Sequence, residues 1–305
     1  MENTRTLERR LGDTMRRKLP DAVAEFIMFV LKQGWACLYG GLLLIAIILT
    51  QVYWSSEIPI ARYDALLMIA IALQILFFVT GLETWEEVRV IALFHITGTV
   101  MEIFKVAAGS WEYPGDGVFK LFDVPLFSGF MYASVGSYMA RVIRIFEMRF
   151  APYPPFWASV ALAVAIYANF FTHHFGPDMR YVLFAITVLV FIRTRIWFLI
   201  GTRWYWMPLP VAAFLSSFFM WLAENIGTMA NVWVYAGQGD FEVVSLAKMG
   251  SWYLLLFVSF VTVTLVLRSA LCQEAWHPKS TRATATHPKA ARTRPAGSRP
   301  ETPRD

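Results

Sequence analysis

Charged residues are scarce in this chain of 305 amino acids. Only 16% of its residues are Asp, Glu, Lys or Arg, whereas soluble domains usually carry about 25%, and 57% are hydrophobic. Runs of about 20 residues with almost no charge recur along the chain, which is the length needed to cross ~30 Å of hydrocarbon. The composition therefore excludes an ordinary soluble domain and predicts a multi-pass membrane protein.

Cysteine and recognisable cofactor motifs are also rare. Cys37 and Cys272 are both predicted to face the cytoplasm, where thiols stay reduced, and neither has the spacing of a metal site. No cofactor is predicted. The net charge of +5 does not indicate nucleic acid binding, because the basic residues flank predicted helix ends or fill the tails. Membrane lipids are the expected partners, and the oligomeric state stays open.

Eight apolar runs predict an all-α fold with about eight transmembrane helices. They cover residues 31–54, 64–82, 88–108, 122–143, 156–174, 180–200, 207–230 and 246–268. Of the 27 Lys and Arg residues, all but five fall on the side of the N-terminus; the five are Arg62, Lys105, Lys120, Arg180 and Lys248. The positive-inside rule then predicts that the N- and C-termini are both cytoplasmic.

Two matching stretches indicate an internal repeat. EIFKVAAGSWEYPG begins at Glu102 and ENIGTMANVWVYAG at Glu224, 122 positions later, and in both a glutamate precedes Trp-x-Tyr-x-Gly. We therefore expect a basic cytoplasmic segment (1–27), a first membrane repeat (28–147), a second (148–272) and a disordered basic cytoplasmic tail (273–305). Four helices in each half predict parallel repeats about an axis normal to the membrane.

The two motif glutamates are the leading candidates for function. An ionisable side chain inside the membrane costs at least ~2.5 kcal/mol, so Glu102 and Glu224 are expected to face a shared interior. One interpretation is structural, with Glu102 paired to Lys105 and Glu224 to Lys248. The other is a working pair of carboxylates, in which the two are not equivalent because Gly227 stands where the first copy has Lys105.

Further polar and aromatic residues are predicted around these acids. The expected cavity lining comprises His95, Lys105, Trp111, Tyr113, Asn169, Trp233, Tyr235 and Lys248. His173 is assigned to catalysis with the glutamates, as a proton relay. A weaker alternative is a metal site formed by His173, His174 and Asp178. Adjacent histidines on a helix point about 100° apart, and the chain has no zinc-type spacing, so no metal is predicted. Glu83, Glu86 and Glu87 are expected to be solvated in an inner loop, with contacts to Arg141 or Arg144 left open.

Several longer strings carry a family resemblance. KQGWACLYG, RYDALL, FHITGTVMEIFK, GSWEYP, VPLFSGFMYASVGSY, IYANFFTHHF and WLAENIGTMANVW together resemble a bacterial inner-membrane family known as domain of unknown function 817, over roughly residues 25–268. The resemblance implies an integral membrane protein and no established activity. A helix-borne acid followed by an aromatic, Gly-rich exit is also similar to small membrane carotenoid cyclases and hydratases, although not all of their motif strings are present.

Three functions remain open from the sequence. The first is a membrane-embedded enzyme that acts on a lipid or isoprenoid by acid catalysis from Glu102 or Glu224, with Lys105 and Lys248 setting their protonation. The second is a small-solute or proton-coupled transporter or channel that uses the same glutamates in a polar path. The third is a structural or partner-binding membrane protein.

Overall fold

The computed structural model describes residues 2–55, 57–237, 239 and 242–278, with side chains from residue 10 onward. The predicted tail falls mostly beyond these residues, since 279–305 lie outside the described part. The described helices are α1 (Glu2–Lys18), α2 (Asp21–Ala36), α3 (Leu38–Tyr53), α4 (Arg62–Val79), α5 (Trp85–Ala107), α6 (Phe127–Ile145), α7 (Phe156–Thr172), α8 (Arg180–Phe191), α9 (Leu209–Met229) and α10 (Leu246–Val266), with a short 3-10 turn at Arg268–Ala270. The strands are β1 (Trp111–Glu112), β2 (Lys120–Leu121), β3 (Val124–Pro125), β4 (Arg149–Ala151), β5 (Arg195–Ile200), β6 (Arg203–Pro208) and β7 (Val234–Tyr235).

Each of the eight predicted runs contains a helix, but fewer than eight helices have the length and composition of a membrane span. Among the described residues, α4, α5, α9 and α10 are long and apolar enough to cross a membrane. A fifth span arises if α2 and α3, which bend by 67° at their junction, are counted as one. The helices α7 and α8 are apolar but shorter. The eight spans therefore stay a prediction, and four to five apolar helices are observed.

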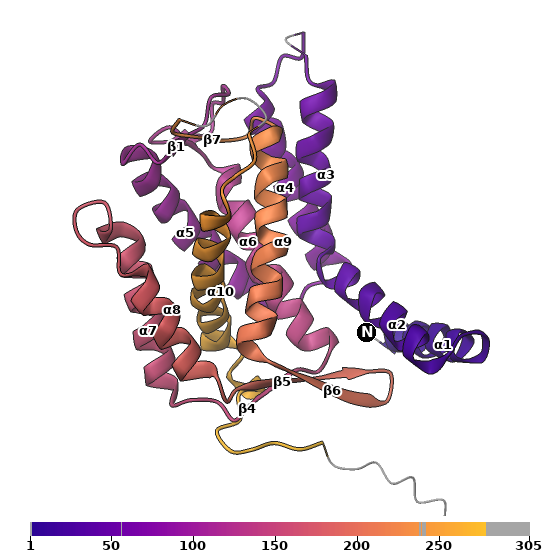
Figure 1. Ribbon diagram of the computed structural model, residues 1–305. Coiled ribbons are helices and arrows are strands. Elements are labelled where there is room, and N and C mark those ends of the chain that lie inside the picture. Colours follow the sequence, from indigo (N-terminus) through magenta and orange to yellow (C-terminus); the bar gives the residue numbers. More distant parts are fainter. Residues whose placement is uncertain (1, 56, 238, 240–241, 279–305) are drawn as a thin grey trace, which may run out of the picture.

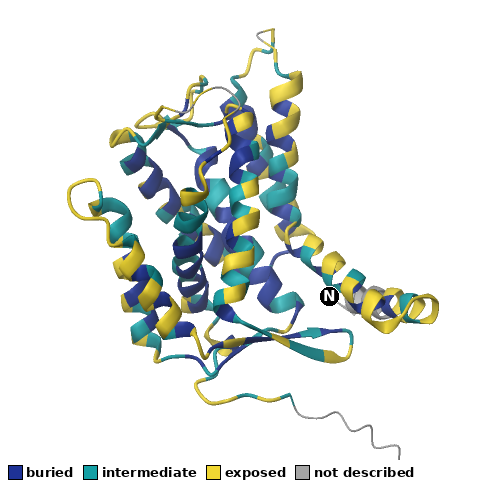
Figure 2. Cartoon of the chain, in the orientation of Figure 1, coloured by how far each residue is buried: buried dark blue, intermediate teal, exposed yellow. Residues whose placement is uncertain are grey.

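The more polar α6 lies at the centre of the bundle. It packs against α2, α3, α4, α5 and α10, so that neighbouring helices cover it on most sides. Figure 2 shows the complementary pattern outside, where α3 and α9 carry exposed faces. Those faces are apolar, with exposed side chains such as Ile45, Leu49, Phe219 and Leu222. An apolar exterior around a partly polar interior is the distribution expected of helices that face lipid.

The bend between α2 and α3 has a local cause. The helix is interrupted at Cys37, and Arg141 of α6 donates from Nη2 to the carbonyl oxygen of Trp35 at 3.0 Å. Arg141 is completely buried, and its guanidinium also lies 5.2 Å from the ring centroid of Phe77. In Figure 1, α1 and α2 project sideways from the upright helices.

Both cysteines are free thiols, Cys37 exposed and Cys272 half-buried.

The predicted helix over 180–200 is wrong in the second half of that range, where the chain forms a strand, so the fold is mostly helical but not all-α. The helix α8 ends at Phe191, and β5 pairs with both β4 and β6 in a three-stranded antiparallel sheet. The β5–β6 hairpin turns at Gly201, whose φ of 59° is the positive value that a type II′ turn requires at its first central residue. The aromatic and β-branched residues on both sides of Gly201 favour strands over a helix.

Of the three glutamates expected to be solvated in an inner loop, only Glu83 lies in the loop before α5, Glu86 and Glu87 lie in its first turn, and Glu83 and Glu87 are buried. Glu83 is 3% exposed and Glu87 2% exposed. Glu87 closes a capping box with Thr84 at the start of α5 and accepts hydrogen bonds from Arg144 at 2.8 and 3.1 Å. Glu83 accepts from Gln74 and, at 2.6 Å, from Ser137. Burial raises the pKa of Glu83. The possible contact with Arg144 is thus present, in a network that joins the α4–α5 loop to α6.

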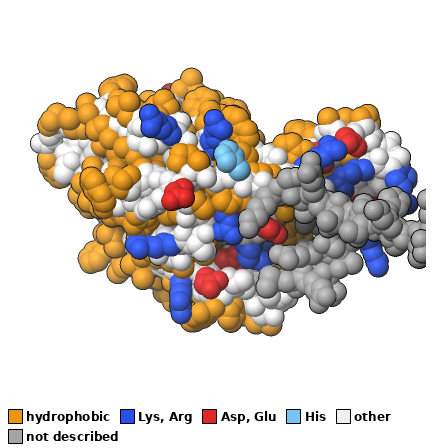
Figure 3. Space-filling model, turned by 90° about the horizontal axis from the view of Figure 1, so that it is seen from below, with side chains coloured by type: hydrophobic (Ala, Val, Ile, Leu, Met, Phe, Trp, Pro, Cys, Tyr) orange, Lys and Arg blue, Asp and Glu red, His pale blue; other side chains and the backbone are white. Residues whose placement is uncertain are grey.

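The three-stranded sheet, α1 and the last described residues lie toward one end of the bundle, and β1 and β7 lie at the other (Figure 1). Figure 3 looks at the sheet end and shows Lys and Arg side chains among hydrophobic ones. Arg149, Arg195 and Arg203, which the sequence assigns to the inner side, begin the three strands of this sheet. This placement agrees with the predicted orientation, which stays a prediction.

Candidate functional site

The two motif glutamates are buried in the interior of the bundle. Glu102 on α5 is 3% exposed and Glu224 on α9 is 5% exposed. Neither carboxylate faces the exterior, and both line the same cavity. The expectation that the two acids turn toward a common space therefore agrees with their positions.

Glu102 is surrounded by aromatic hydrogen-bond donors. Its Oε2 accepts from the indole Nε1 of Trp111 at 2.7 Å and from the hydroxyl of Tyr113 at 2.8 Å. Its Oε1 accepts from the hydroxyl of Tyr132 on α6 at 2.6 Å. The Trp-x-Tyr of the motif thus folds back onto the glutamate nine residues earlier, which explains the spacing of the repeated pattern.

Glu224 is held by a similar but smaller set. It accepts from the hydroxyl of Tyr235, the counterpart of Tyr113, and from the indole of Trp252 on α10. Trp233, the counterpart of Trp111, packs against Gly227, where an added Cβ would lie 2.0 Å from its ring. The replacement of Lys105 by Gly227 therefore creates the space for Trp233 and makes the two acids different.

The two motif copies are hydrogen-bonded to each other. The strands β1 and β7 pair antiparallel, with Trp111 opposite Tyr235 and Glu112 opposite Val234. The rings of Trp111 and Tyr235 meet edge to face, with centroids 5.7 Å apart. The two halves of the chain thus meet at their most similar stretches, although the parallel arrangement of repeats stays a prediction.

The motif tyrosines remain hydroxyl donors over the whole physiological range. Burial and the neighbouring Glu102 carboxylate raise the pKa of Tyr113 well above its ordinary value. Burial and Glu224 do the same to the pKa of Tyr235. Each phenol therefore keeps its proton and directs it toward a glutamate oxygen.

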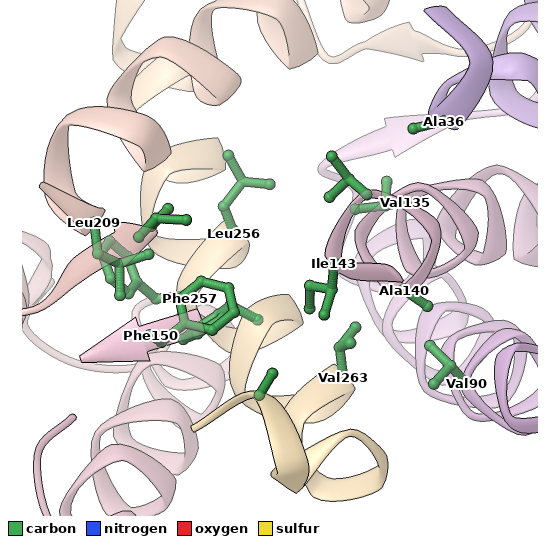
Figure 4. Close-up of a cluster of buried hydrophobic side chains, with 14 of the residues drawn as sticks. Ala36, Val90, Val135, Ala140, Ile143, Phe150, Leu209, Leu256, Phe257 and Val263 are labelled. Carbon is green, nitrogen blue, oxygen red and sulfur yellow. The ribbon is translucent and has the colours of Figure 1, made fainter. Parts of the chain in front are cut away.

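A cavity of about 1090 Å³ extends from the glutamates into the bundle. This exceeds the ~300–1,000 Å³ of typical small-molecule pockets. Its wall combines α3 and α6 of the first half with α9 and α10 of the second. Most of the wall is apolar; Figure 4 shows Leu256 and Phe257 of α10 on one side and Val135 and Ile143 of α6 on the other. We call this cavity the chamber, and the part around Glu102 and Glu224 its polar end.

Three cations also line the polar end, namely Lys105, Lys248 and Arg180. The ammonium of Lys105 lies 2.9 Å from Nε2 of His174 and 4.1 Å from the ring centroid of Phe170. Lys248 lies over the ring of Tyr235, 3.6 Å from its centroid. In the described part of the chain, neither the Glu102–Lys105 nor the Glu224–Lys248 ion pair is formed within 4 Å, although Lys248 is attracted by the Glu224 carboxylate.

Both histidines of the THHF segment line the chamber, and their tautomers follow from their partners. His173 Nδ1 lies 2.9 Å from the carbonyl oxygen of Asn169, which can only accept, so Nδ1 carries the proton. His174 Nε2 faces the Lys105 ammonium, which can only donate, so Nε2 is unprotonated. The two rings are 4.1 Å apart.

Two predicted lining residues lie elsewhere among the described residues. His95 packs against Phe130, with ring centroids 4.6 Å apart, and does not line the chamber. Asn169 organises the loop after α7 by accepting from the backbone of Met179 at 3.0 Å and donating to Asp178 at 3.2 Å. The alternative metal site is not formed either: across the described ranges, no three His, Cys, Asp or Glu side chains group closely enough to hold an ion.

The sequence missed three residues of the polar end. Tyr132 on α6 and Trp252 on α10 each donate to a glutamate, and they lie 120 positions apart, close to the 122 positions that separate the two glutamates. That near match was a usable signal. Arg180 was counted only as a basic residue at a helix start.

Comparison with known proteins places the chain in a family. It is 42% identical over 243 residues to "Uncharacterized protein YoaT" of Bacillus subtilis (strain 168), covering 79% of this chain and 91% of the relative. No solved structure matches. Residues 25–260 match the family described as "Protein of unknown function (DUF817)", which confirms the resemblance seen in the sequence. The chain therefore belongs to this DUF817 family.

Proposed function

We propose that this protein is a membrane-embedded enzyme that acts on a lipid or isoprenoid by acid catalysis from its buried glutamates. One observation carries the proposal: Glu102 and Glu224, from different halves of the chain, open on a single large and mostly apolar chamber. Intramembrane carboxylates are costly, and two at the head of one chamber indicate a common task.

The dimensions of the chamber suit a long hydrocarbon chain. Lining residues of α9 run from Leu209 to Glu224, which corresponds to ~22 Å at 1.5 Å per residue. That length is most of the ~30 Å thickness of a bilayer core. A chain bound there would place its polar or unsaturated end against the glutamates.

The unequal hydrogen bonding of the two acids assigns their roles. Glu102 receives three donors and Glu224 two, so Glu102 is the better stabilised anion and Glu224 the better proton donor. A proton passes from the Glu224 carboxyl to a substrate C=C bond, whose π electrons form the new C–H bond. The resulting carbocation loses a proton from a neighbouring carbon to the Glu102 carboxylate. The net change is a double-bond shift; where a second C=C bond of the substrate first attacks the carbocation and forms a C–C bond, the same proton loss completes a ring closure, and neither reaction needs an oxidant or other reactant.

The surrounding side chains support these steps. The rings of Trp111 and Trp252 line the polar end, where aromatic rings can stabilise a developing cation. His173 has the role of proton relay that returns the proton from Glu102 to Glu224 between turnovers. Its Nδ1 is engaged by Asn169, which leaves Nε2 to exchange the proton.

Lipid analysis of producing cells tests this function. Extracts of cells that lack the protein are compared by mass spectrometry with extracts of cells that produce the wild type, Glu102→Gln or Glu224→Gln. Because the proposed reaction is an isomerisation, we expect a lipid that shifts in chromatographic retention time, at unchanged mass, with the wild type only. Glu112→Gln is the matched control, because Glu112 lies in the same motif but is exposed and outside the chamber wall.

An unchanged lipid profile with the wild type overturns the proposal, and so does a product that persists in both glutamine variants. The transporter alternative predicts instead glutamate-dependent uptake of a proton or cationic solute into vesicles with unaltered lipids.

A further inference from the structure

Two of the three cations at the polar end of the chamber, Lys105 and Lys248, form no ion pair with the described residues. Lys105 is only 3% exposed, yet its contacts are a neutral histidine nitrogen and an aromatic ring. Lys248 faces the rings of Tyr235 and Trp111 at 3.6 and 6.0 Å. Within the described ranges, neither lysine forms an ion pair, and of the three cations Arg180 alone has one, with Asp178 at 3.2 Å.

The positive charges also oppose one another. Lys105 experiences repulsion from both Lys248 and Arg180 and a smaller attraction to Asp178, and Lys248 is attracted by Glu224. The nearby carboxylates of Glu102 and Glu224 direct their oxygens to Trp and Tyr donors instead. A buried cation without an ion-pair partner is unfavourable, so an anion placed between Lys105 and Lys248 would be stabilised.

We propose that Lys105, Lys248 and Arg180 bind the oxyanion headgroup, such as a phosphate, of an amphiphile whose hydrocarbon chain occupies the chamber. The inference rests on the proposed function and names the class of its substrate: an anionic lipid or an isoprenoid phosphate. Lysine and arginine are the side chains that proteins use for phosphate oxygens.

The arrangement is complete on the chain's own side. His174 accepts one N–H of Lys105 and thereby orients the ammonium, which leaves two N–H groups for a ligand. The ring of Phe170 covers the other side of Lys105. Ser110, which also lines the chamber, lies 3.4 Å from His174 and supplies a hydroxyl at the same end.

A binding experiment separates the contributions of headgroup and chain. The full-length protein in neutral maltoside micelles is titrated with dodecyl phosphate, with dodecanol and with inorganic phosphate, and tryptophan fluorescence is followed because Trp111, Trp233 and Trp252 line the chamber. We expect dodecyl phosphate to bind at least about tenfold more tightly than either dodecanol or inorganic phosphate, since a charge-assisted contact contributes about this factor.

Charge-removing variants locate the site. Lys105→Gln and Lys248→Gln should each weaken dodecyl phosphate binding about tenfold and leave dodecanol binding unchanged. Lys248 is half-buried, so Lys248→Gln tests the inference even where the buried Lys105 variant does not fold. Arg193→Gln removes an exposed cation outside the chamber wall and should change nothing.

The inference is overturned if dodecanol binds as tightly as dodecyl phosphate. It is also overturned if inorganic phosphate binds as tightly as dodecyl phosphate, because the site would then be one for the free ion. The glutamine variants of Glu102 and Glu224 distinguish this failure from that of the proposed function. Lysine-dependent binding without glutamate-dependent chemistry refutes the enzyme and retains the anion site. Glutamate-dependent chemistry with indifferent lysines refutes the anion site and retains the enzyme.

Discussion

The hydroxyl of Tyr132 tests the charge of Glu102 directly. Tyr132→Phe removes a single oxygen, which donates to Glu102 Oε1 at 2.6 Å, and leaves the ring in place. The other two donors, Trp111 and Tyr113, both serve Oε2. The variant therefore leaves Oε1 of a buried carboxylate without a partner.

The expected loss depends on whether that carboxylate is ionised. A hydrogen bond to a charged group contributes about 1.5–3 kcal/mol, whereas one between neutral groups contributes about 0.5–1.5 kcal/mol. If Glu102 is the anion that its three donors indicate, the free energy of unfolding should fall by about 2 kcal/mol or more. Tyr167→Phe is the matched control, because its hydroxyl donates to the neutral carbonyl of Thr97 at 3.2 Å.

Equilibrium unfolding in mixed micelles, followed by tryptophan fluorescence, measures both variants. Tyr132→Phe should be the more destabilised of the two by about 1 kcal/mol or more. Equal losses would mean that Glu102 is neutral at rest, and the assignment of Glu102 as proton acceptor and Glu224 as donor would then be wrong.

Two further predictions concern stability. Gly227→Ala should lower the free energy of unfolding by about 1–3 kcal/mol, and with it the melting temperature, because the added Cβ would overlap the ring of Trp233. Gly34→Ala has open space around it and should be neutral or stabilising by up to about 1 kcal/mol. A Gly34→Ala variant that melts below Gly227→Ala would contradict the packing. The pKa of His174 is lowered by partial burial and by its neighbours Lys105 and His173. As the pH falls, the imidazole of His174 is therefore protonated in the unfolded chain before it is protonated in the folded one. The free energy of unfolding should fall as the pH drops below about 6.5. Melting curves between pH 7.5 and 5 should show a smaller decline in His174→Gln than in the wild type, and identical declines would refute this role.

The helices and the pair of acids followed from local pattern alone. Apolar runs predicted eight regions that each contain a helix, because burial in lipid or core selects residue types that can be counted along the chain, but they predicted neither α1 nor the break between α2 and α3. The spacing shared by the two matching stretches singled out Glu102 and Glu224. The prediction of a helix over 180–200 is wrong after Phe191 because a short apolar run does not distinguish a helix from a strand. The β5–β6 hairpin at Gly201 makes the end of this run a strand.

The sequence by itself determined that this protein is apolar, helical and a member of its family, and it marked two buried glutamates and their aromatic exits. The tertiary structure decided which donors reach each carboxylate, that Lys105 contacts His174 instead of Glu102, that Glu83 and Glu87 are buried, and that one chamber joins both acids. The physical reason is sequence separation. Periodicity records what a residue must face, but the partner that satisfies a buried polar atom comes from a distant helix, and only the packed chain brings the two together.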